Sequence, residues 1–214
     1  MSRSLINIFD RHRPNDLPIS WHASDSTNAV NSMGRAIVNE FVPYRPDKIL
    51  DVRERHRVLC VVIGGLAAQL RGSPYVTRDV DVTPARTREN FARLATALKE
   101  LHAKLRIPDM DEPLAAPLDE RSFEQGTSWP YVTKHGYVDI ALRPDGTRGY
   151  DDLRRSATSE QLTDTVTTFV ADLADVIRSK EAAGREKDRA VLPILRQALE
   201  RSRRNERDKP GMER

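Results

Sequence analysis

Two aspartates separated by one residue, Asp79 and Asp81, are the side chains of this 214-residue sequence best suited to chemistry. They lie in the alternating segment 79–82, which is typical of a strand. Both carboxylates should therefore point to one side of a sheet, while Val80 and Val82 point into the core. Neighbouring carboxylates repel each other unless a cation lies between them. Mg²⁺ is the natural cation because it prefers hard oxygen ligands and accompanies phosphate substrates, and Mn²⁺ is the second candidate.

A third carboxylate, Asp139, lies in a second predicted strand, 137–142. It stands on the face opposite the apolar Val138, Ile140 and Leu142, which is an unusual place for a charge. If the two strands are neighbours, the three carboxylates converge and form a site for two metal ions. One ion would then activate an attacking hydroxyl, and the other would neutralise a leaving pyrophosphate. Because Asp-x-Asp pairs also arise in strands by chance, this hypothesis needs support from elsewhere in the sequence.

That support comes from a glycine pair, Gly64-Gly65, between a predicted buried strand, 58–63, and a predicted short helix, 66–71. Glycines at such a junction let the backbone approach a ligand closely, and the start of the helix offers free N–H groups to a phosphate. A strand, Gly-Gly and helix also occur together as ordinary packing. The order here is more specific, because the Asp-x-Asp strand follows about fifteen residues later.

In this order of motifs the sequence resembles the DNA polymerase β-like nucleotidyltransferase superfamily. The resemblance is closest to its AbiEii-type and MenT-type branch, which is associated with toxin–antitoxin systems. Segments 61–68, 72–81, 136–140 and 172–188 carry it. The chain departs from the superfamily at Leu66, where serine is frequent, and at Tyr75, near which related chains often have a basic residue.

The resemblance implies an α+β fold, in which helices flank a small mixed β-sheet and a helical segment follows at the C-terminus. It also implies metal ligation by Asp79 and Asp81, with Asp139 as the third carboxylate, and an NTP such as ATP as the substrate. The implied acceptor is the 3′ end of a tRNA, and the implied partner is an antitoxin protein. A small-molecule or protein acceptor stays open, as does the role of toxin.

Lys180 and Asp188 occupy places where helix periodicity leads one to expect apolar residues. Lys180 extends the apolar stripe of the predicted helix 172–183, and Asp188 heads the stripe of the predicted helix 186–201. A lysine in such a place extends to solvent, pairs with a carboxylate or faces a cleft. In the functional interpretation, Lys180 contacts the NTP phosphates, a role that the resemblance supports. Asp188 then orients a basic group or the acceptor. The alternative is a structural ion pair.

The remaining candidate residues are less specific for a function. Thr77 and Arg78 precede the aspartate pair, so both could contact phosphates. In the alternative interpretation, Thr77 caps the start of the strand and Arg78 faces solvent. Cys60 lies in an apolar run and is expected to be a buried thiol in a reducing compartment. The five histidines lack the spacing of metal ligands and are expected at the surface or in structural roles.

Composition and patterning, taken together with what the resemblance implies, predict four parts. Residues 1–46 form an N-terminal extension, 47–171 the nucleotidyltransferase core, 172–202 the C-terminal helices that complete the site, and 203–214 a frayed tail. Further helices are expected at 47–57 and 88–105, a loop at 107–120, and strands at 128–133 and 165–170. Pro130 should confine its strand to the edge of the sheet.

Charge and hydropathy narrow the class of protein. The net charge of +3 permits contact with nucleic acid without requiring it. No stretch reaches the roughly 18 apolar residues of a membrane span, so we expect a cytoplasmic protein without membrane contact.

Three functions remain compatible with these residues and motifs. The first is Mg²⁺-dependent transfer of a nucleoside monophosphate from an NTP, with release of pyrophosphate. The second is a non-catalytic module that keeps the fold and binds a nucleotide or a partner. The third, hydrolysis of phosphodiesters by the same carboxylates, fits the glycine pair less well.

Overall fold

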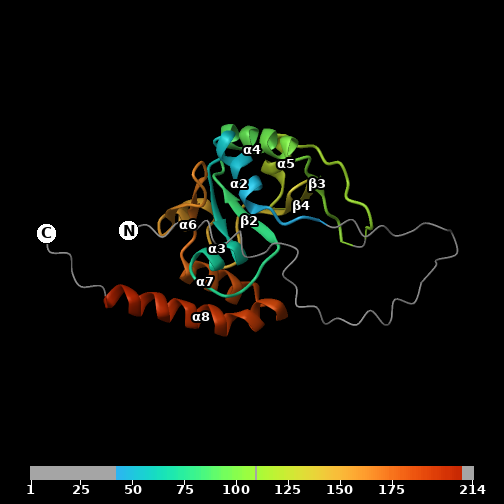
Figure 1. Ribbon diagram of the computed structural model, residues 1–214. Helices are drawn as coiled ribbons and strands as arrows, with labels where there is room; N and C mark the ends of the chain where they lie inside the picture. The colour runs from blue at the N-terminus through green and yellow to red at the C-terminus, as the bar shows by residue number, and fades with distance from the viewer. Residues whose placement is uncertain (1–41, 109, 209–214) are drawn as a thin grey trace, which may run out of the picture. The chain divides into compact units, whose positions relative to one another are not determined.

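A computed structural model describes residues 42–208 except residue 109, and the predicted extension up to residue 41 lies outside this range. The described residues belong to one compact unit that begins at Val42. Its secondary structure is a mixed sheet with helices against it, which confirms the predicted α+β class (Figure 1).

The sheet has seven strands in the order β3-β4-β5-β2-β1-β7-β6. Their bounds are β1 Cys60–Ile63, β2 Asp79–Pro84, β3 Lys104–Leu105, β4 Ser128–Thr133, β5 Gly136–Ala141, β6 Thr158–Gln161 and β7 Thr167–Val170. The central strand β2 pairs antiparallel with β1 and parallel with β5. Strand β5 is therefore the neighbour of the Asp-x-Asp strand, as the convergence of the three carboxylates requires.

Helices cover both faces of the sheet (Figure 1). Their bounds are α2 Pro46–Arg55, α3 Gly64–Leu70, α4 Arg88–Glu100, α5 Glu120–Gln125, α6 Tyr150–Arg154, α7 Leu173–Ala183 and α8 Glu186–Arg207. Helices α2, α4 and α5 lie together on one side, while α7 packs against α3 on the other side and α8 packs against α7. The side chains of Thr87 and Asp172 cap α4 and α7 by accepting backbone N–H bonds, and Gly184 ends α7 in a left-handed conformation.

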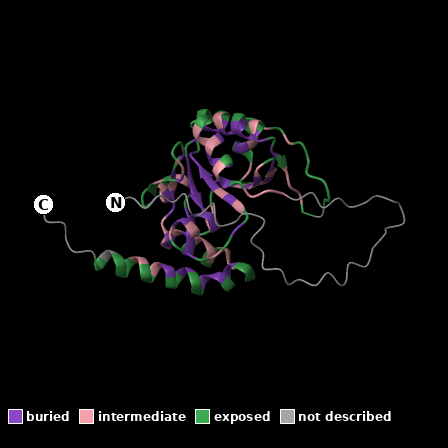
Figure 2. Cartoon of the chain, viewed as in Figure 1, coloured by how far each residue is buried: buried purple, intermediate pink, exposed green. Residues whose placement is uncertain are grey.

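The core is built on the apolar face of the central strands. Val80 and Val138 are nearly inaccessible and pair with each other across β2 and β5. Figure 2 shows the central strands largely buried, whereas the C-terminal part of α8 is exposed. Among the helices that the structure describes, none combines the length and apolar character needed to cross a membrane.

Several elements differ from the prediction. The helix expected at 88–105 ends at Glu100, because His102 adopts a positive φ of 56° and the chain turns into the short strand β3. Pro130 does not place β4 at the edge, since β3 lies outside it. The ladder tolerates the proline because β3 pairs only with Tyr131 and Val132, and the Pro130 carbonyl accepts a bond from Arg106 N–H.

Helices and strands also appear where none was predicted. Helix α5 and strand β6 were not expected. Helix α8 extends to Arg207, so residues 203–207, assigned from the sequence to a frayed tail, are helical. The division into an extension, a core and a C-terminal segment stays a prediction.

Candidate functional site

The three aspartates singled out in the sequence meet at one place in the sheet. Asp81 and Asp139 are direct partners in the parallel ladder between β2 and β5, and Asp79 lies two residues before Asp81. One carboxylate oxygen from each residue lies within 4.8 Å of the others, and all three side chains are half-buried. Their chemistry fits a divalent metal, because such a cluster of hard oxygen donors is what Mg²⁺ and Mn²⁺ prefer.

The glycine pair makes this cluster sterically possible. Gly64 has φ +68°, and a Cβ built on it would overlap the carboxylate of Asp81. A Cβ on Gly65 would lie 2.5 Å from Cβ of Thr77. Both glycines belong to the first turn of α3, which no side chain caps. The missing side chains therefore allow α3 to lie directly against the residues of the site.

Asp81 is the carboxylate that the cluster perturbs most strongly. Burial, followed by the negative charges of Asp79 and Asp139, raises the pKa of Asp81 to about 7. The positive charge of Lys180 and a backbone hydrogen bond from Gly65 act in the opposite direction without cancelling the rise. Among the described residues, the charge of Lys180 does not compensate this carboxylate fully, and such a condition favours binding of a metal.

Asp139 has a protein partner that the sequence did not reveal. Arg106, which follows β3, forms an ion pair with its Oδ1 and stacks 4.6 Å from the ring centroid of Tyr137. Burial raises the pKa of Asp139 in spite of the charge and hydrogen bond of Arg106. Because 33 residues separate Arg106 from Asp139, no local pattern signals this contact.

Thr77 and Arg78, the two residues before β2, differ in their surroundings. Thr77 is buried, and its hydroxyl donates a hydrogen bond to Asp79 Oδ1. Arg78 has an exposed side chain. Thr77 therefore holds one carboxylate of the cluster in place. A phosphate contact of either residue stays a prediction.

Lys180 and Asp188 form an ion pair that joins α7 to α8. Lys180 Nζ lies 2.9 Å from Asp188 Oδ1, and Arg185 Nε lies 2.5 Å from Asp188 Oδ2. Burial of Asp188 raises its pKa, but the hydrogen bonds with Lys180 and Arg185 outweigh burial and lower it below the ordinary value. The contact between Lys180 and Asp188 is thus the ion pair that the structural interpretation of these two residues predicted. It also holds Lys180 near enough to the site for its charge to lower the pKa of Asp81.

The chain is similar to known proteins in its structure but not in its sequence. The sequence matches no family model and no curated protein. The lincosamide antibiotic adenylyltransferase LnuA, bound to lincomycin, aligns with a TM-score of 0.48 and 12% identity, over 72% of this chain and 95% of its own. The enzyme ANT(2'')-Ia in complex with adenylyl-2''-tobramycin aligns with a TM-score of 0.47 and 12% identity, over 74% of this chain and 90% of its own.

A putative nucleotidyltransferase from Thermotoga maritima aligns with a TM-score of 0.43 and 19% identity, over 73% of this chain and 91% of its own. Of these solved structures, LnuA is thus an adenylyltransferase and the Thermotoga maritima protein a putative nucleotidyltransferase. Similarity at this level leaves the function to be argued from the carboxylate cluster itself.

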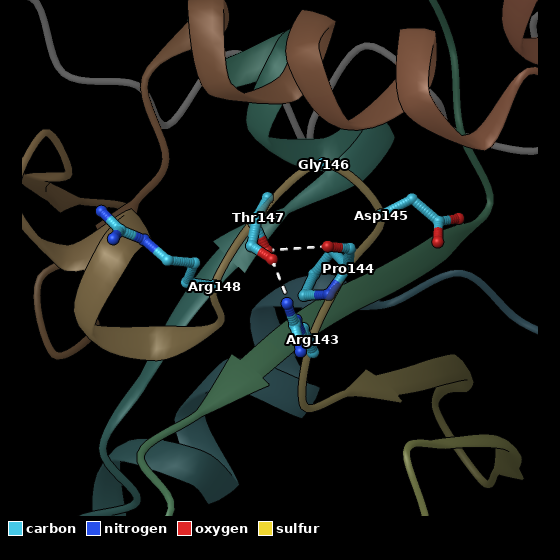
Figure 3. Close-up of a pocket in the computed structure, with 6 residues that line it drawn as sticks. All are labelled: Arg143, Pro144, Asp145, Gly146, Thr147 and Arg148. Atoms are coloured by element: carbon cyan, nitrogen blue, oxygen red, sulfur yellow. Dashed lines mark hydrogen bonds between the residues drawn. The ribbon is translucent and has the colours of Figure 1, made fainter.

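A surface pocket of about 490 Å³ lies elsewhere, over the turn that follows β5. It is lined by the consecutive residues 143–148, and Gly146 packs closely on α7, with its Cβ position 2.8 Å from Ala182. Figure 3 shows the side chains of Asp145 and Arg148 pointing in opposite directions, and Thr147 bonded within its own turn to Pro144. None of the three aspartates lines this pocket, so we do not assign the chemistry to it.

The raised pKa of Asp81 predicts how stability depends on pH when metal is absent. An unfolded aspartate has a pKa of about 3.9, whereas folded Asp81 has one of about 7. Between these values the folded state binds more protons, so the free energy of unfolding should fall as the pH rises from about 5 to about 8. Glu100, with a pKa lowered to about 2, contributes little in this window because it is ionised in both states.

Thermal denaturation with a chelator present tests this at both ends of the pH window. The Asp81→Asn variant is the control. Its Tm should fall much less between the lower and the higher pH than the Tm of the natural protein does. Added Mg²⁺ should raise the Tm of the natural protein more at the higher pH. Equal pH slopes for the two proteins would contradict the assignment of the titration to Asp81.

Proposed function

We propose that the protein transfers a nucleoside monophosphate from an NTP to an acceptor and releases pyrophosphate. The observation that carries this proposal is the convergence of Asp79, Asp81 and Asp139 beside the glycine pair at the start of α3. A divalent cation held by these carboxylates, Mg²⁺ or Mn²⁺, supplies a Lewis acid for phosphoryl chemistry. A hydrolase would need the same metal site, but the glycine-lined approach suits a triphosphate better.

The side chains around the cluster then have separate roles. Thr77 holds Asp79, and Arg106 holds one oxygen of Asp139, so the cluster is fixed before the substrate binds. We propose that Lys180, together with Gly64, Gly65 and Arg78, binds the triphosphate, and that Thr77 and Asp188 support this site. Support for Lys180 comes from its electrostatic coupling to Asp81 and from its ion pair with a buried carboxylate, which fixes its position.

For the acceptor we propose the 3′ end of an RNA such as tRNA. The support is a helix rich in exposed basic residues beside the site. Lys187 at the start of α8 lowers the pKa of Asp139 by its charge, so this helix begins within electrostatic range of the cluster. The exposed basic residues farther along α8 are Arg189, Arg196, Arg201, Arg203, Arg204 and Arg207, and of these Arg196 forms an ion pair with Glu181. Arginines spaced along an exposed helix attract the phosphates of a nucleic acid.

A role as the toxin of a toxin–antitoxin pair is also a proposal, which only the resemblance of segments 61–68, 72–81, 136–140 and 172–188 supports. It requires that expression of the natural chain arrests bacterial growth and that co-expression of a partner protein relieves the arrest. Normal growth on expression of an active enzyme would reject the toxin role and leave the transferase activity standing.

The activity is tested by incubating the protein with each NTP, labelled at the α-phosphate, together with Mg²⁺ and total tRNA. We expect label on RNA and equimolar pyrophosphate, both abolished by a chelator. Parallel reactions with lincomycin and tobramycin test small-molecule acceptors. If no acceptor is labelled and calorimetry detects no NTP binding, the proposed function is wrong. Binding of NTP without transfer would instead favour the non-catalytic module.

A further inference from the structure

Tyr44 has a buried hydroxyl within electrostatic range of the carboxylate cluster, although no pattern in the sequence singles it out. Within the described part of the chain, this hydroxyl is one of few buried polar side-chain atoms that have no hydrogen-bond partner. Buried hydroxyls are normally paired, because burial removes the water that would otherwise bond to them. An unpaired hydroxyl beside a candidate site therefore calls for a partner that the site itself binds.

The backbone around Tyr44 is fixed against the start of β5. Arg45 N–H donates a 2.9 Å hydrogen bond to the carbonyl of His135, and a Cβ on Gly136 would lie 2.9 Å from the Pro43 carbonyl. Gly136 has a positive φ of 137°, so this close approach depends on glycine. The next residue along β5, Tyr137, is the ladder partner of Asp79. The segment that carries Tyr44 is thus held at the end of the sheet where the Asp-x-Asp strand begins.

The carboxylates of Asp79 and Asp81 lie within electrostatic range of the Tyr44 side chain. Burial raises the pKa of Tyr44, and the negative charges of Asp79 and Asp81 raise it further. A tyrosine phenol has an ordinary pKa of about 10, so it keeps its proton at neutral pH and serves as a neutral donor. Neutrality matters here, because a lysine or arginine at this position would compete with a metal ion for Asp79 and Asp81. A phenol can donate to a phosphate oxygen without displacing the cation.

We propose that the Tyr44 hydroxyl donates a hydrogen bond to a phosphate oxygen of the bound nucleotide, and is thus a substrate-binding residue of this site. This inference rests on the proposed nucleotidyltransferase function. The chemical class that it recognises is the polyphosphate group and not the base, since its neighbours are the metal-binding carboxylates.

The test is Tyr44→Phe, which removes only the hydroxyl. The matched control is Tyr131→Phe, because Tyr131 is also buried but pairs with Val138, whose side chain lies on the sheet face opposite Asp139. Calorimetry with ATP and Mg²⁺, and separately with inorganic triphosphate and Mg²⁺, should show about ten-fold weaker binding to Tyr44→Phe for both ligands, as expected for a lost hydrogen bond to a charged group. Tyr131→Phe should bind both ligands as the natural protein does.

A second measurement separates binding from a structural role. Because the hydroxyl has no hydrogen-bond partner among the described residues, its removal should leave the Tm unchanged or raise it by about 2–4 °C. Unchanged affinity of Tyr44→Phe for both ligands overturns the inference while the proposed function stands. A lowered Tm with unchanged affinity shows a structural tyrosine and also overturns it. If the natural protein binds neither ligand, both the function and the inference fail.

Discussion

Replacing Asp81 by asparagine is expected to lower the rate of nucleotidyl transfer by about a thousandfold or more, which corresponds to about 4 kcal/mol of barrier. Asp81 is the middle member of the cluster, since it neighbours Asp79 along β2 and Asp139 across the ladder. An asparagine fills nearly the same volume but lacks the negative charge that a metal ion requires. The loss should therefore appear in metal binding as well as in turnover.

The same substitution should stabilise the metal-free protein at neutral pH. The raised pKa of Asp81 means that ionising it costs free energy in the folded state, and an asparagine avoids this cost. A suitable control is Asp164→Asn, because Asp164 is exposed in the turn before β7. The measurements are turnover over a range of Mn²⁺ concentrations and Tm with a chelator. Retention of more than about a tenth of the activity by Asp81→Asn would contradict the role of the cluster.

Replacing Gly64 by alanine is expected to lower turnover by about a hundredfold, the effect typical of displacing a catalytic group by about 1 Å. An alanine Cβ would occupy the space of the Asp81 carboxylate, so that side chain must move away from Asp79 and Asp139. The positive φ of 68° adds backbone strain of roughly 1–2 kcal/mol for a residue with a Cβ. Both activity and stability should therefore fall.

Gly72→Ala is the matched control for Gly64→Ala. Gly72 also has a positive φ, of 86°, but a Cβ there would meet nothing within 4 Å. The two variants should lose similar stability from backbone strain, while only Gly64→Ala loses turnover. Steady-state kinetics and thermal denaturation of both variants measure the difference. Similar turnover in the two would show that contact with Asp81 is not what makes Gly64 necessary.

The Lys180–Asp188 pair shows how one pattern in a sequence supports two interpretations. Helix periodicity placed both residues among apolar neighbours, and this predicted either a structural ion pair or a role in the site. The fold shows the ion pair, because α7 and α8 fold back on each other and bring residues eight positions apart into contact. The same fold brings Lys180 near Asp81. Periodicity identifies such residues, but only packing shows what they contact.

The α+β class was implied by the resemblance to a known superfamily, whereas local patterns were enough to predict that Asp79 and Asp81 share one face of a strand and that a glycine pair follows a buried strand. These features follow from local rules, since side-chain direction and backbone freedom depend on nearest neighbours. The pairing of β5 with β2, which brings Asp139 into the cluster, came from the folded chain. The fold also placed Tyr44 and Arg106 at the site, because contacts across 33 or more residues leave no periodic trace in a single sequence.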